Sequence, residues 1–325
     1  MVRNILLMLL CIASLNAEHI RIISFPSKAG FVKDVQILEE TLQFLEHQTD
    51  KQFLPDMVQQ TLDGSEYPLV DIQIFIQEFE ASLLPYAKKN YLIPNPEWCW
   101  DSLESLKKVD LILARTREVE RIYTDVGLPV YYLGFIGADQ FLKGIEKNFS
   151  EYFHLKGFSP FKSAHEVVES WTQSFPHLII VDHWPNYKKV SSKITILSNY
   201  LTDDEIKWLQ NNAGVHLCPS QTEGFGHYIC EALSAGSVVI TTDAPPMNEF
   251  VTDTRFLIKP ETTSKHGWAT LYQCNPKSIR KTIHSVMQIP PKELKEAGRQ
   301  NRERYLTMKE EFVKRLDHLI QGIVN

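Results

Sequence analysis

The sequence has 325 residues, which is more than one small core needs and fits two domains of ordinary size. Hydrophobic residues make up 43% of the chain and charged residues 23%, a composition that excludes an extensively disordered protein. The net charge of −6 argues against sequence-independent binding of nucleic acid, because such binding needs a basic surface. We therefore expect no nucleic-acid partner.

The first residues have the pattern of a secretory signal peptide. Arg3 precedes an apolar run from Ile5 to Leu15, and the small residue Ala17 follows closely. The run is shorter than the ~20 apolar residues that a membrane-spanning helix requires. We expect residues 1–17 to be a signal peptide that directs the protein to the lumen of the secretory pathway or out of the cell. The alternative is a cytoplasmic protein whose apolar start is a buried strand.

Strand-like and helix-like segments alternate through the first half of the chain. Helical patterns occupy residues 32–47, 101–108 and 118–127. Short segments rich in Val, Ile and Leu predict strands at 19–25, 70–76, 88–94, 109–116 and 129–135. Strands of this composition, separated by helices, indicate a parallel sheet that is covered on both faces.

The alternation stops after Asp139, where the chain turns polar and aromatic, and it starts again near residue 165. The second half predicts helices at 165–173 and 203–212 and strands at 177–183, 193–199, 215–220 and 237–243. A last helical pattern runs from Thr307 to Val324. The restart indicates a second domain.

We therefore expect an α/β protein with two Rossmann-like, doubly wound domains that face a cleft, because ligands of open α/β sheets bind outside the carboxyl ends of the strands. Residues 18–145 should form the N-terminal domain and residues 146–306 the second domain. Residues 307–325 should form a C-terminal helix that packs back toward the N-terminal domain.

The segment from Pro219 to Gly236, PSQTEGFGHYICEALSAG, places two glutamates around a glycine-rich turn that opens a helix. The free N–H groups of a first helical turn and the helix dipole form an anion site, for which phosphate is the natural ligand. Glu231 leans back toward this end of the helix, where Glu223 also lies. Carboxylates beside phosphate serve to accept hydrogen bonds from neutral hydroxyls, which indicates a nucleotide sugar. The alternative is two solvated glutamates favoured by the helix dipole.

This segment resembles the Glu-x7-Glu signature of the retaining glycosyltransferases of GT-B fold, the "group 1" family, with E-G-F-G-x4-E-A-L-S-A-G intact. The following VVITTDAPPMNEFV also resembles the family, whose corresponding loop ends in a glutamate, here Glu249. Upstream, HLKGFSPFKSAHEVVESW resembles the family's phosphate-binding entry into the second domain, and Lys162 fits its lysine. Phe158 stands where the family has an arginine after Gly157, and whether Lys156 replaces that arginine is left open.

The resemblance implies a retaining hexosyltransferase that moves a sugar from a nucleoside-diphosphate sugar to an acceptor hydroxyl. It assigns catalytic roles to Glu223 and Lys162. In the first domain, which would lie on the acceptor side, the loop from Ser24 to Gly30 takes the place of a loop that faces the donor phosphates and the acceptor, with Lys28 and Gly30 as candidates. The second domain would bind the donor through Glu231, Gly224, Phe225, Gly226, Gly157 and Ser159.

The chain contains no Asp-x-Asp motif, so we expect neither a metal nor a cofactor, with the nucleotide sugar acting as a substrate. The sequence leaves open whether the acceptor is a glycan, a lipid or a protein, and whether the protein contacts a membrane peripherally. Two further readings remain: a GT-B sugar-nucleotide epimerase or phosphorylase, and a non-catalytic protein that binds nucleotide sugars.

Overall fold

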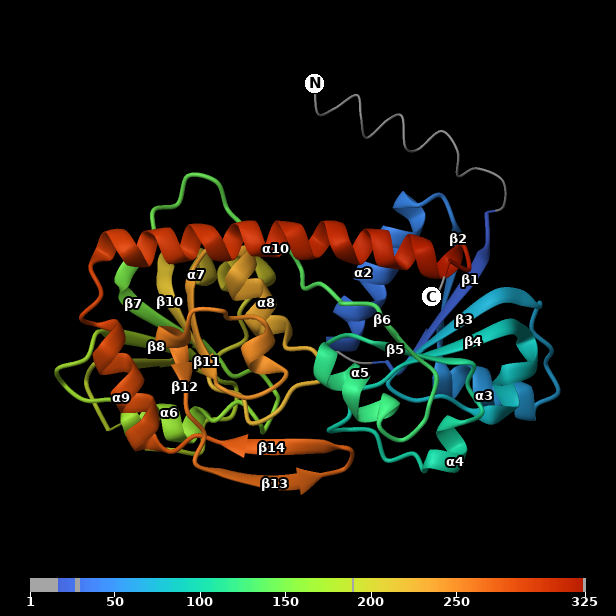
Figure 1. Cartoon of the computed structure of the whole chain (residues 1–325), viewed down its shortest axis with the longest axis horizontal. Coiled ribbons are helices and arrows are strands. Elements are labelled where there is room, and N and C mark those ends of the chain that lie inside the picture. Colours follow the sequence, from blue (N-terminus) through green and yellow to red (C-terminus); the bar gives the residue numbers. More distant parts are fainter. Residues whose placement is uncertain (1–16, 27–29, 189, 324–325) are drawn as a thin grey trace.

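The computed structural model describes residues 17–26, 30–188 and 190–323. It contains two sheets of six strands each, and every pairing within these sheets is parallel. Figure 1 shows the two sheets side by side, each flanked by helices. The expected α/β fold with two doubly wound halves is therefore confirmed. Residues 1–16 of the expected signal peptide and the candidate Lys28 lie outside the described residues.

The first sheet has the strand order β2-β1-β3-β4-β5-β6. Its strands are β1 (His19–Ser24), β2 (Gln48–Phe53), β3 (Val70–Ile76), β4 (Ala87–Ile93), β5 (Leu111–Ala114) and β6 (Val130–Tyr132). The helical segments of this half are α2 (Gly30–Phe44), α3 (Leu54–Leu62), the 3₁₀ helix η2 (Ala81–Tyr86), α4 (Leu103–Leu106) and α5 (Arg117–Thr124). The sequence pattern misses β2, because QTDKQF is polar and the strand lies at the edge of the sheet, where it is only partly buried.

The second sheet has the order β12-β11-β10-β7-β8-β9. Its strands are β7 (Asn148–Leu155), β8 (His177–Val181), β9 (Ile194–Leu197), β10 (Ala213–Cys218), β11 (Val238–Thr242) and β12 (Leu257–Ile258). The helical segments are α6 (Ala164–Ser170), α7 (Asp203–Asn212), α8 (His227–Ser234), η3 (Met247–Glu249), η4 (Thr254–Phe256), α9 (Pro276–Val286) and α10 (Pro291–Ile320). The strand order reverses between β7 and β10, which is where doubly wound sheets bind their ligands.

The central strand β7 is the largest miss of the sequence analysis, which reads this region as an interruption between domains. Its sequence NFSEYFHL mixes aromatic and polar residues and lacks the aliphatic run of the other inner strands. In the structure Tyr152, Phe153 and His154 are all buried. The imidazole Nδ1 of His154 lies 2.8 Å from the carbonyl oxygen of Leu217, so a main-chain partner allows this polar side chain to occupy the core.

The last helix, α10, begins at Pro291 and not at Thr307 as the sequence pattern predicts. The stretch before Thr307 is dominated by charged residues, which hides the helical periodicity. Figure 1 shows α10 running along the second half of the molecule and reaching the first sheet with its carboxyl end. The hydroxyl of Tyr131 in β6 donates to the carbonyl oxygen of Arg315 at 2.9 Å, which joins the helix to the first domain.

A two-stranded antiparallel hairpin forms a second bridge between the domains. Strands β13 (Thr262–His266) and β14 (Ala269–Gln273) pair with each other only. At the tip of the hairpin, the main-chain N–H of Trp268 donates to the carbonyl oxygen of Pro96 at 3.2 Å, and its indole N–H donates to that of Asp101 at 3.1 Å. Over residues 17–26, 30–188 and 190–323, no helix combines the length and the apolar character needed to cross a membrane.

Candidate active site

The loop after β10 leads into α8 at the point where the strand order of the second sheet reverses. Gly226 precedes the helix with a φ of 99°, a left-handed conformation that glycine adopts without a steric penalty. The N–H groups of Ile229 and Cys230 donate to the carbonyl oxygen of Gly226 at 3.0 and 3.1 Å. The N–H groups before them have no acceptor within the helix, so the start of α8 is suited to an anion.

Glu223 lies in the loop just before this helix start. Its carboxylate accepts a hydrogen bond from the hydroxyl of Ser220 at 2.6 Å, and that hydroxyl lies 2.5 Å from the phenol oxygen of Tyr228. Burial raises the pKa of Glu223 above its ordinary value, although the nearby Lys162 and the Ser220 hydrogen bond oppose the shift. The carboxylate is therefore held in a defined position at the mouth of the anion site.

Glu231 lies one turn into α8, and its side chain is 1% exposed. One carboxylate oxygen accepts a hydrogen bond from the Lys33 ammonium at 2.6 Å, and the other accepts one from the Gln210 amide at 3.1 Å. Burial alone would raise the pKa of Glu231, but the Lys33 ion pair, the charge of His227 and the Gln210 hydrogen bond together outweigh burial and lower the pKa. Because Lys33 belongs to α2, this ion pair connects the two domains.

Lys162 is close to both glutamates. Its ammonium lies 4.0 Å from the centre of the Tyr228 ring and donates to the carbonyl oxygen of Leu155 at 3.4 Å. Burial lowers the pKa of Lys162, and the charges of Glu223 and Glu231 are the main influences that oppose this shift. Over the described part of the chain it makes no ion pair within 4.0 Å. The structure thus gathers Glu223, Lys162 and Glu231 around the start of α8.

The remaining residues proposed from the sequence lie on the neighbouring loops. Gly157 follows β7 with a φ of 56°, and the hydroxyl of Ser159 accepts the N–H of Phe161 at 3.2 Å. Among the described residues, no hydrogen bond or ion pair joins either of them to the two glutamates. Lys156 forms an ion pair at 3.1 Å with the buried Asp182, so it is already engaged as a cation. Gly30 begins α2, where an added Cβ would lie 3.9 Å from the imidazole ring of His227.

Three charged or polar residues that the sequence analysis misses form a chain from the loop after β5, through α2, to α8. The imidazole Nε2 of His227 lies 2.7 Å from one carboxylate oxygen of Asp34, and the guanidinium of Arg115 donates to the other at 2.9 Å. Burial by itself raises the pKa of Asp34, but Arg115 and His227 outweigh burial and lower it. Only the position of His227 beside Gly226 in the glycine-rich segment could have drawn attention to this group.

Glu97, in the loop after β4, is a further carboxyl that the sequence analysis misses. It is 6% exposed, and one oxygen accepts the main-chain N–H of Gly224 at 3.0 Å. Its other oxygen has no hydrogen-bond partner among the described residues. Burial, followed by the charge of Glu223, raises the pKa of Glu97 to about 7. Glu97 thus faces Glu223 from the other domain.

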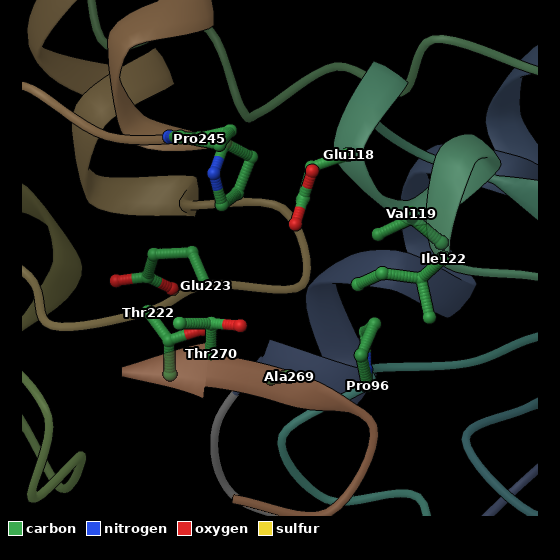
Figure 2. Close-up of a pocket in the computed structure, with 10 residues that line it drawn as sticks. Pro96, Glu118, Val119, Ile122, Thr222, Glu223, Pro245, Ala269 and Thr270 are labelled. Atoms are coloured by element: carbon green, nitrogen blue, oxygen red, sulfur yellow. The ribbon is translucent and has the colours of Figure 1, made fainter. Parts of the chain in front are cut away.

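The pocket beside Glu223 is narrow in this structure. Figure 2 shows Glu118 and Val119 of α5 on one side of it, and Glu223 and Pro245 of the second domain on the other. Its volume is about 10 Å³, which is roughly the space for one water molecule. The two domains are therefore in close contact here.

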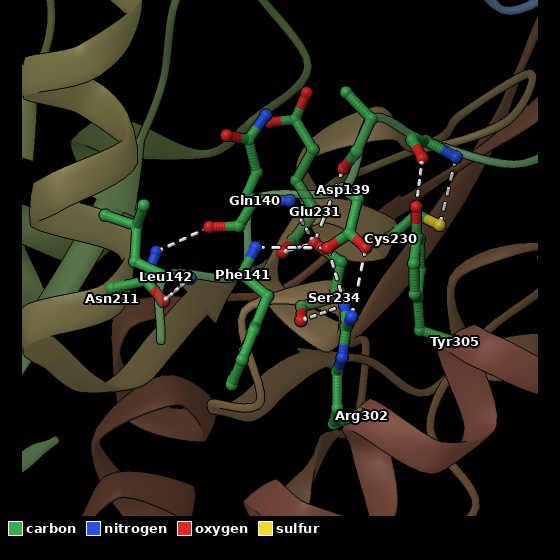
Figure 3. A network of polar contacts seen from close by, with 12 residues as sticks. Asp139, Gln140, Phe141, Leu142, Asn211, Cys230, Glu231, Ser234, Arg302 and Tyr305 are labelled. Atoms are coloured by element: carbon green, nitrogen blue, oxygen red, sulfur yellow. Dashed lines mark hydrogen bonds and ion pairs between the residues drawn. The ribbon is translucent and has the colours of Figure 1, made fainter. Parts of the chain in front are cut away.

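A polar network holds the other side of α8, as Figure 3 shows. The main-chain N–H of Gln140, in the segment that joins the two sheets, donates to the hydroxyl of Ser234 at 2.9 Å. Arg302 of α10 forms an ion pair with Asp139 and also donates to the carbonyl oxygen of Ser234 at 2.8 Å. The helix that carries Glu231 is therefore fixed to both the connecting segment and α10.

Comparisons with known proteins show which proteins this chain resembles. Residues 152–304 match the family described as "Glycosyl transferases group 1". The O-antigen chain mannosyltransferase RfbU of Salmonella typhimurium strain LT2 is 26% identical over 169 residues, which cover 48% of this chain and 43% of that protein. The match thus spans less than half the length of this curated relative.

Two solved structures illustrate the similarity of the fold. Sucrose-phosphate synthase from Thermosynechococcus elongatus has a TM-score of 0.70 at 13% identity, over 94% of this chain and 99% of that chain. The pneumococcal O-GlcNAc transferase GtfA, solved in complex with UDP and GlcNAc, has a TM-score of 0.57 at 14% identity, over 77% of this chain and 57% of that chain. Residues 152–304 thus resemble the glycosyl transferases group 1 family, and the expected GT-B fold of the chain is confirmed.

Proposed function

We propose that the protein transfers a sugar from a nucleoside-diphosphate sugar to an acceptor hydroxyl and retains the configuration of the anomeric carbon. The observation that carries this proposal is the gathering of Glu223, Lys162 and Glu231 around the start of α8, at the reversal point of the second sheet. The complex of GtfA with UDP and GlcNAc supports a nucleotide sugar as the donor.

The surroundings of each carboxylate suit it to a different part of the donor. The lowered pKa of Glu231 keeps it ionised and able to accept hydrogen bonds from the two ribose hydroxyls. The Lys33 ammonium occupies one of its oxygens in this structure, so ribose binding would displace that contact. Glu223, oriented by Ser220, would bind hydroxyls of the transferred sugar. The main chain of Gly224 to Gly226 would contact the sugar and the phosphates.

The proposed reaction exchanges one bond at the anomeric carbon for another. The bond from that carbon to the diphosphate oxygen breaks, and its electron pair stays on the phosphate. The start of α8 and the Lys162 ammonium stabilise this charge, and loss of one such donor costs about 3 kcal/mol, or roughly a hundredfold in rate. The acceptor oxygen bonds to the carbon from the same side, and its proton passes to a phosphate oxygen. The start of α8 and the Lys162 ammonium would thus do the work of the metal ion that other transferases use.

Donor binding would also require the domains to separate, because the pocket beside Glu223 has room for only about one water molecule. The contacts to be broken include the Lys33 to Glu231 ion pair and the Gly224 to Glu97 hydrogen bond. We infer that the donor enters an open form and that the same domain surfaces close again over it.

A thermal-shift screen of nucleotide sugars, followed by an assay of nucleoside-diphosphate release, tests the proposal. A ligand at 100 times its dissociation constant stabilises a protein by about 2.7 kcal/mol, so the correct donor should raise the melting temperature clearly. Release of the diphosphate should depend on an added acceptor. Lys162→Gln should reduce it about a hundredfold, whereas Lys277→Gln, at an exposed position of α9, should leave it unchanged.

Two other outcomes would contradict the proposal and identify its alternatives. Tight binding of a nucleotide sugar without turnover in the presence of any acceptor would indicate a non-catalytic binding protein. Conversion of the donor into a stereoisomer, with no sugar transferred, would indicate a sugar-nucleotide epimerase.

A further inference from the structure

Two tryptophans of the loop between β4 and α4 are exposed to solvent. Trp98 is 42% exposed and Trp100 is 67% exposed, whereas Cys99 between them is buried. Tryptophan is the largest side chain and on average buries most of its ring. Exposed aromatic side chains that gather in one place mark contact surfaces for other molecules. The two indole rings are therefore candidates for contact with a ligand.

Hydrogen bonds hold this loop at three places. One carboxyl oxygen of Glu97 accepts the main-chain N–H of Gly224 at 3.0 Å. The main-chain N–H and the indole N–H of Trp268, at the tip of the β13–β14 hairpin, donate to the carbonyl oxygens of Pro96 and Asp101. These two anchors lie on either side of the exposed tryptophans, so the main chain presents both rings in one arrangement. A preorganised surface loses little conformational freedom when it binds a ligand.

The exposed tryptophans belong to an aromatic cluster that spans both domains. The ring centres of Trp98 and Phe161 lie 5.3 Å apart, and Phe161 belongs to the loop of the second domain that also carries Lys162. The centre of the imidazole ring of His266, at the end of β13, lies 5.3 Å from that of Trp100 and 6.4 Å from that of Trp98. We call Trp98, Trp100, Phe161 and His266 the tryptophan surface.

The segments that carry the tryptophan surface also reach the narrow pocket beside Glu223. Figure 2 shows Pro96 of the same loop, and Ala269 and Thr270 of the hairpin, around this pocket together with Glu223. The loop and the hairpin thus border the site proposed for the transferred sugar. An acceptor must bring its hydroxyl to that sugar, so a surface on these two segments is well placed to hold the rest of the acceptor.

Two carboxylates lie beside the exposed rings. Asp101 follows Trp100 in the chain, and Glu78, in the loop after β3, is close enough for the charge of Asp101 to act on it. Burial, followed by that charge, raises the pKa of Glu78. Carboxylates accept hydrogen bonds from hydroxyl groups and repel phosphate groups. Together with the net charge of −6, they disfavour an anionic membrane as the partner of this surface.

Aromatic rings next to carboxylates suit a sugar. A pyranose ring has a face of C–H groups, which packs against the flat face of an aromatic ring, and a rim of hydroxyl groups, which donate to carboxylates. We propose that the tryptophan surface binds the acceptor of the proposed sugar transfer, on which this inference rests, and that the acceptor is a neutral glycan whose rings stack on Trp98 and Trp100.

¹⁹F NMR of the full-length protein labelled with 5-fluorotryptophan tests the proposal. The chain has six tryptophans, and the loss of one signal in Trp98→Phe and of another in Trp100→Phe assigns the two resonances. The probes are neutral oligosaccharides of glucose, mannose, galactose and N-acetylglucosamine, each titrated alone and with UDP or GDP present. At least one oligosaccharide should shift both resonances saturably.

Matched variants separate stacking on a ligand from packing within the protein. Trp100→Ala, followed through the Trp98 signal, should weaken the apparent affinity for that oligosaccharide roughly tenfold or more, because truncation of a contacting tryptophan is costly. Trp100→Phe keeps a flat ring and should retain most of the affinity. Trp208→Ala, at an exposed position of α7, is the control and should leave the affinity unchanged. Trp98→Ala, followed through the Trp100 signal, provides a second variant should Trp100→Ala fail to fold.

Three results would overturn the proposal. The first is the absence of a saturable shift with every oligosaccharide, with and without nucleotide. The second is an equal loss of affinity in Trp100→Ala and Trp208→Ala. The third is a shift caused by vesicles of phosphatidylcholine and phosphatidylglycerol but by none of the oligosaccharides, which would assign the tryptophans to a membrane surface. The titration needs no turnover, so its failure and the failure of the donor screen are distinguishable.

Discussion

Glu97→Gln should change how the stability of the protein depends on pH. The Glu97 carboxyl is 6% exposed, and burial together with the charge of Glu223 raises its pKa from 4.5 to about 7, against the opposing charge of Arg115. Glutamine cannot ionise, but its side-chain oxygen can still accept the N–H of Gly224. The substitution therefore removes the titration while preserving the hydrogen bond.

The size and sign of the effect follow from the two pKa values. Above pH 4.5 the unfolded chain loses the Glu97 proton, whereas the folded protein keeps it until pH 7 is approached. The folded state then binds more protons, so the free energy of unfolding falls as the pH rises through this window. For the two pKa values above, the loss between pH 4.5 and pH 8 is about 3 kcal/mol. Glu97→Gln should lack this loss.

Urea unfolding of wild type and Glu97→Gln at several pH values between 4.5 and 8 measures the difference. The variant should gain stability relative to wild type as the pH rises, by up to about 3 kcal/mol at pH 8. Glu66→Gln, at an exposed position of the same domain, serves as the control and should follow wild type at every pH. Parallel curves for wild type and Glu97→Gln would refute the reasoning, because they would mean that Glu97 titrates alike in both states.

Glu231→Gln should mainly raise KM for the donor, because the ribose does not change during the reaction, whereas Glu223→Gln should mainly lower kcat. Steady-state kinetics of variants with unchanged circular dichroism would check both expectations. A folded Glu223→Gln enzyme with wild-type kcat would contradict the proposed site. EDTA should leave activity unchanged, and a loss that Mg²⁺ or Mn²⁺ restores would count against metal-independent transfer. Gly224→Ala should destabilise the closed arrangement of the two domains by about 1–3 kcal/mol, because the added Cβ would lie 2.9 Å from the Cα of Asn95. A melting temperature equal to that of wild type would rule out this contact.

The sequence by itself determined the class of fold and indicated the segment at the centre of the candidate site. Aliphatic segments that alternate with helical ones have few ways to bury their apolar faces, so they indicate parallel sheets covered by helices. The glycine at 226 and the apolar periodicity after it are local features, and they indicate a helix start with free N–H groups. Glu223 and Glu231 are close in sequence, so helical geometry alone places them at the same end of α8.

Only the tertiary structure decided what these residues face. The partners Lys33 and Glu231 lie 198 positions apart, and Glu97 and Gly224 lie 127 positions apart, so no local pattern could pair them. The strand β7 forms from a polar and aromatic segment because β8 and β10 supply partners on both of its sides. The raised pKa of Glu97 and the lowered pKa of Glu231 likewise depend on burial and on charges from the other domain, which exist only once the two domains pack together.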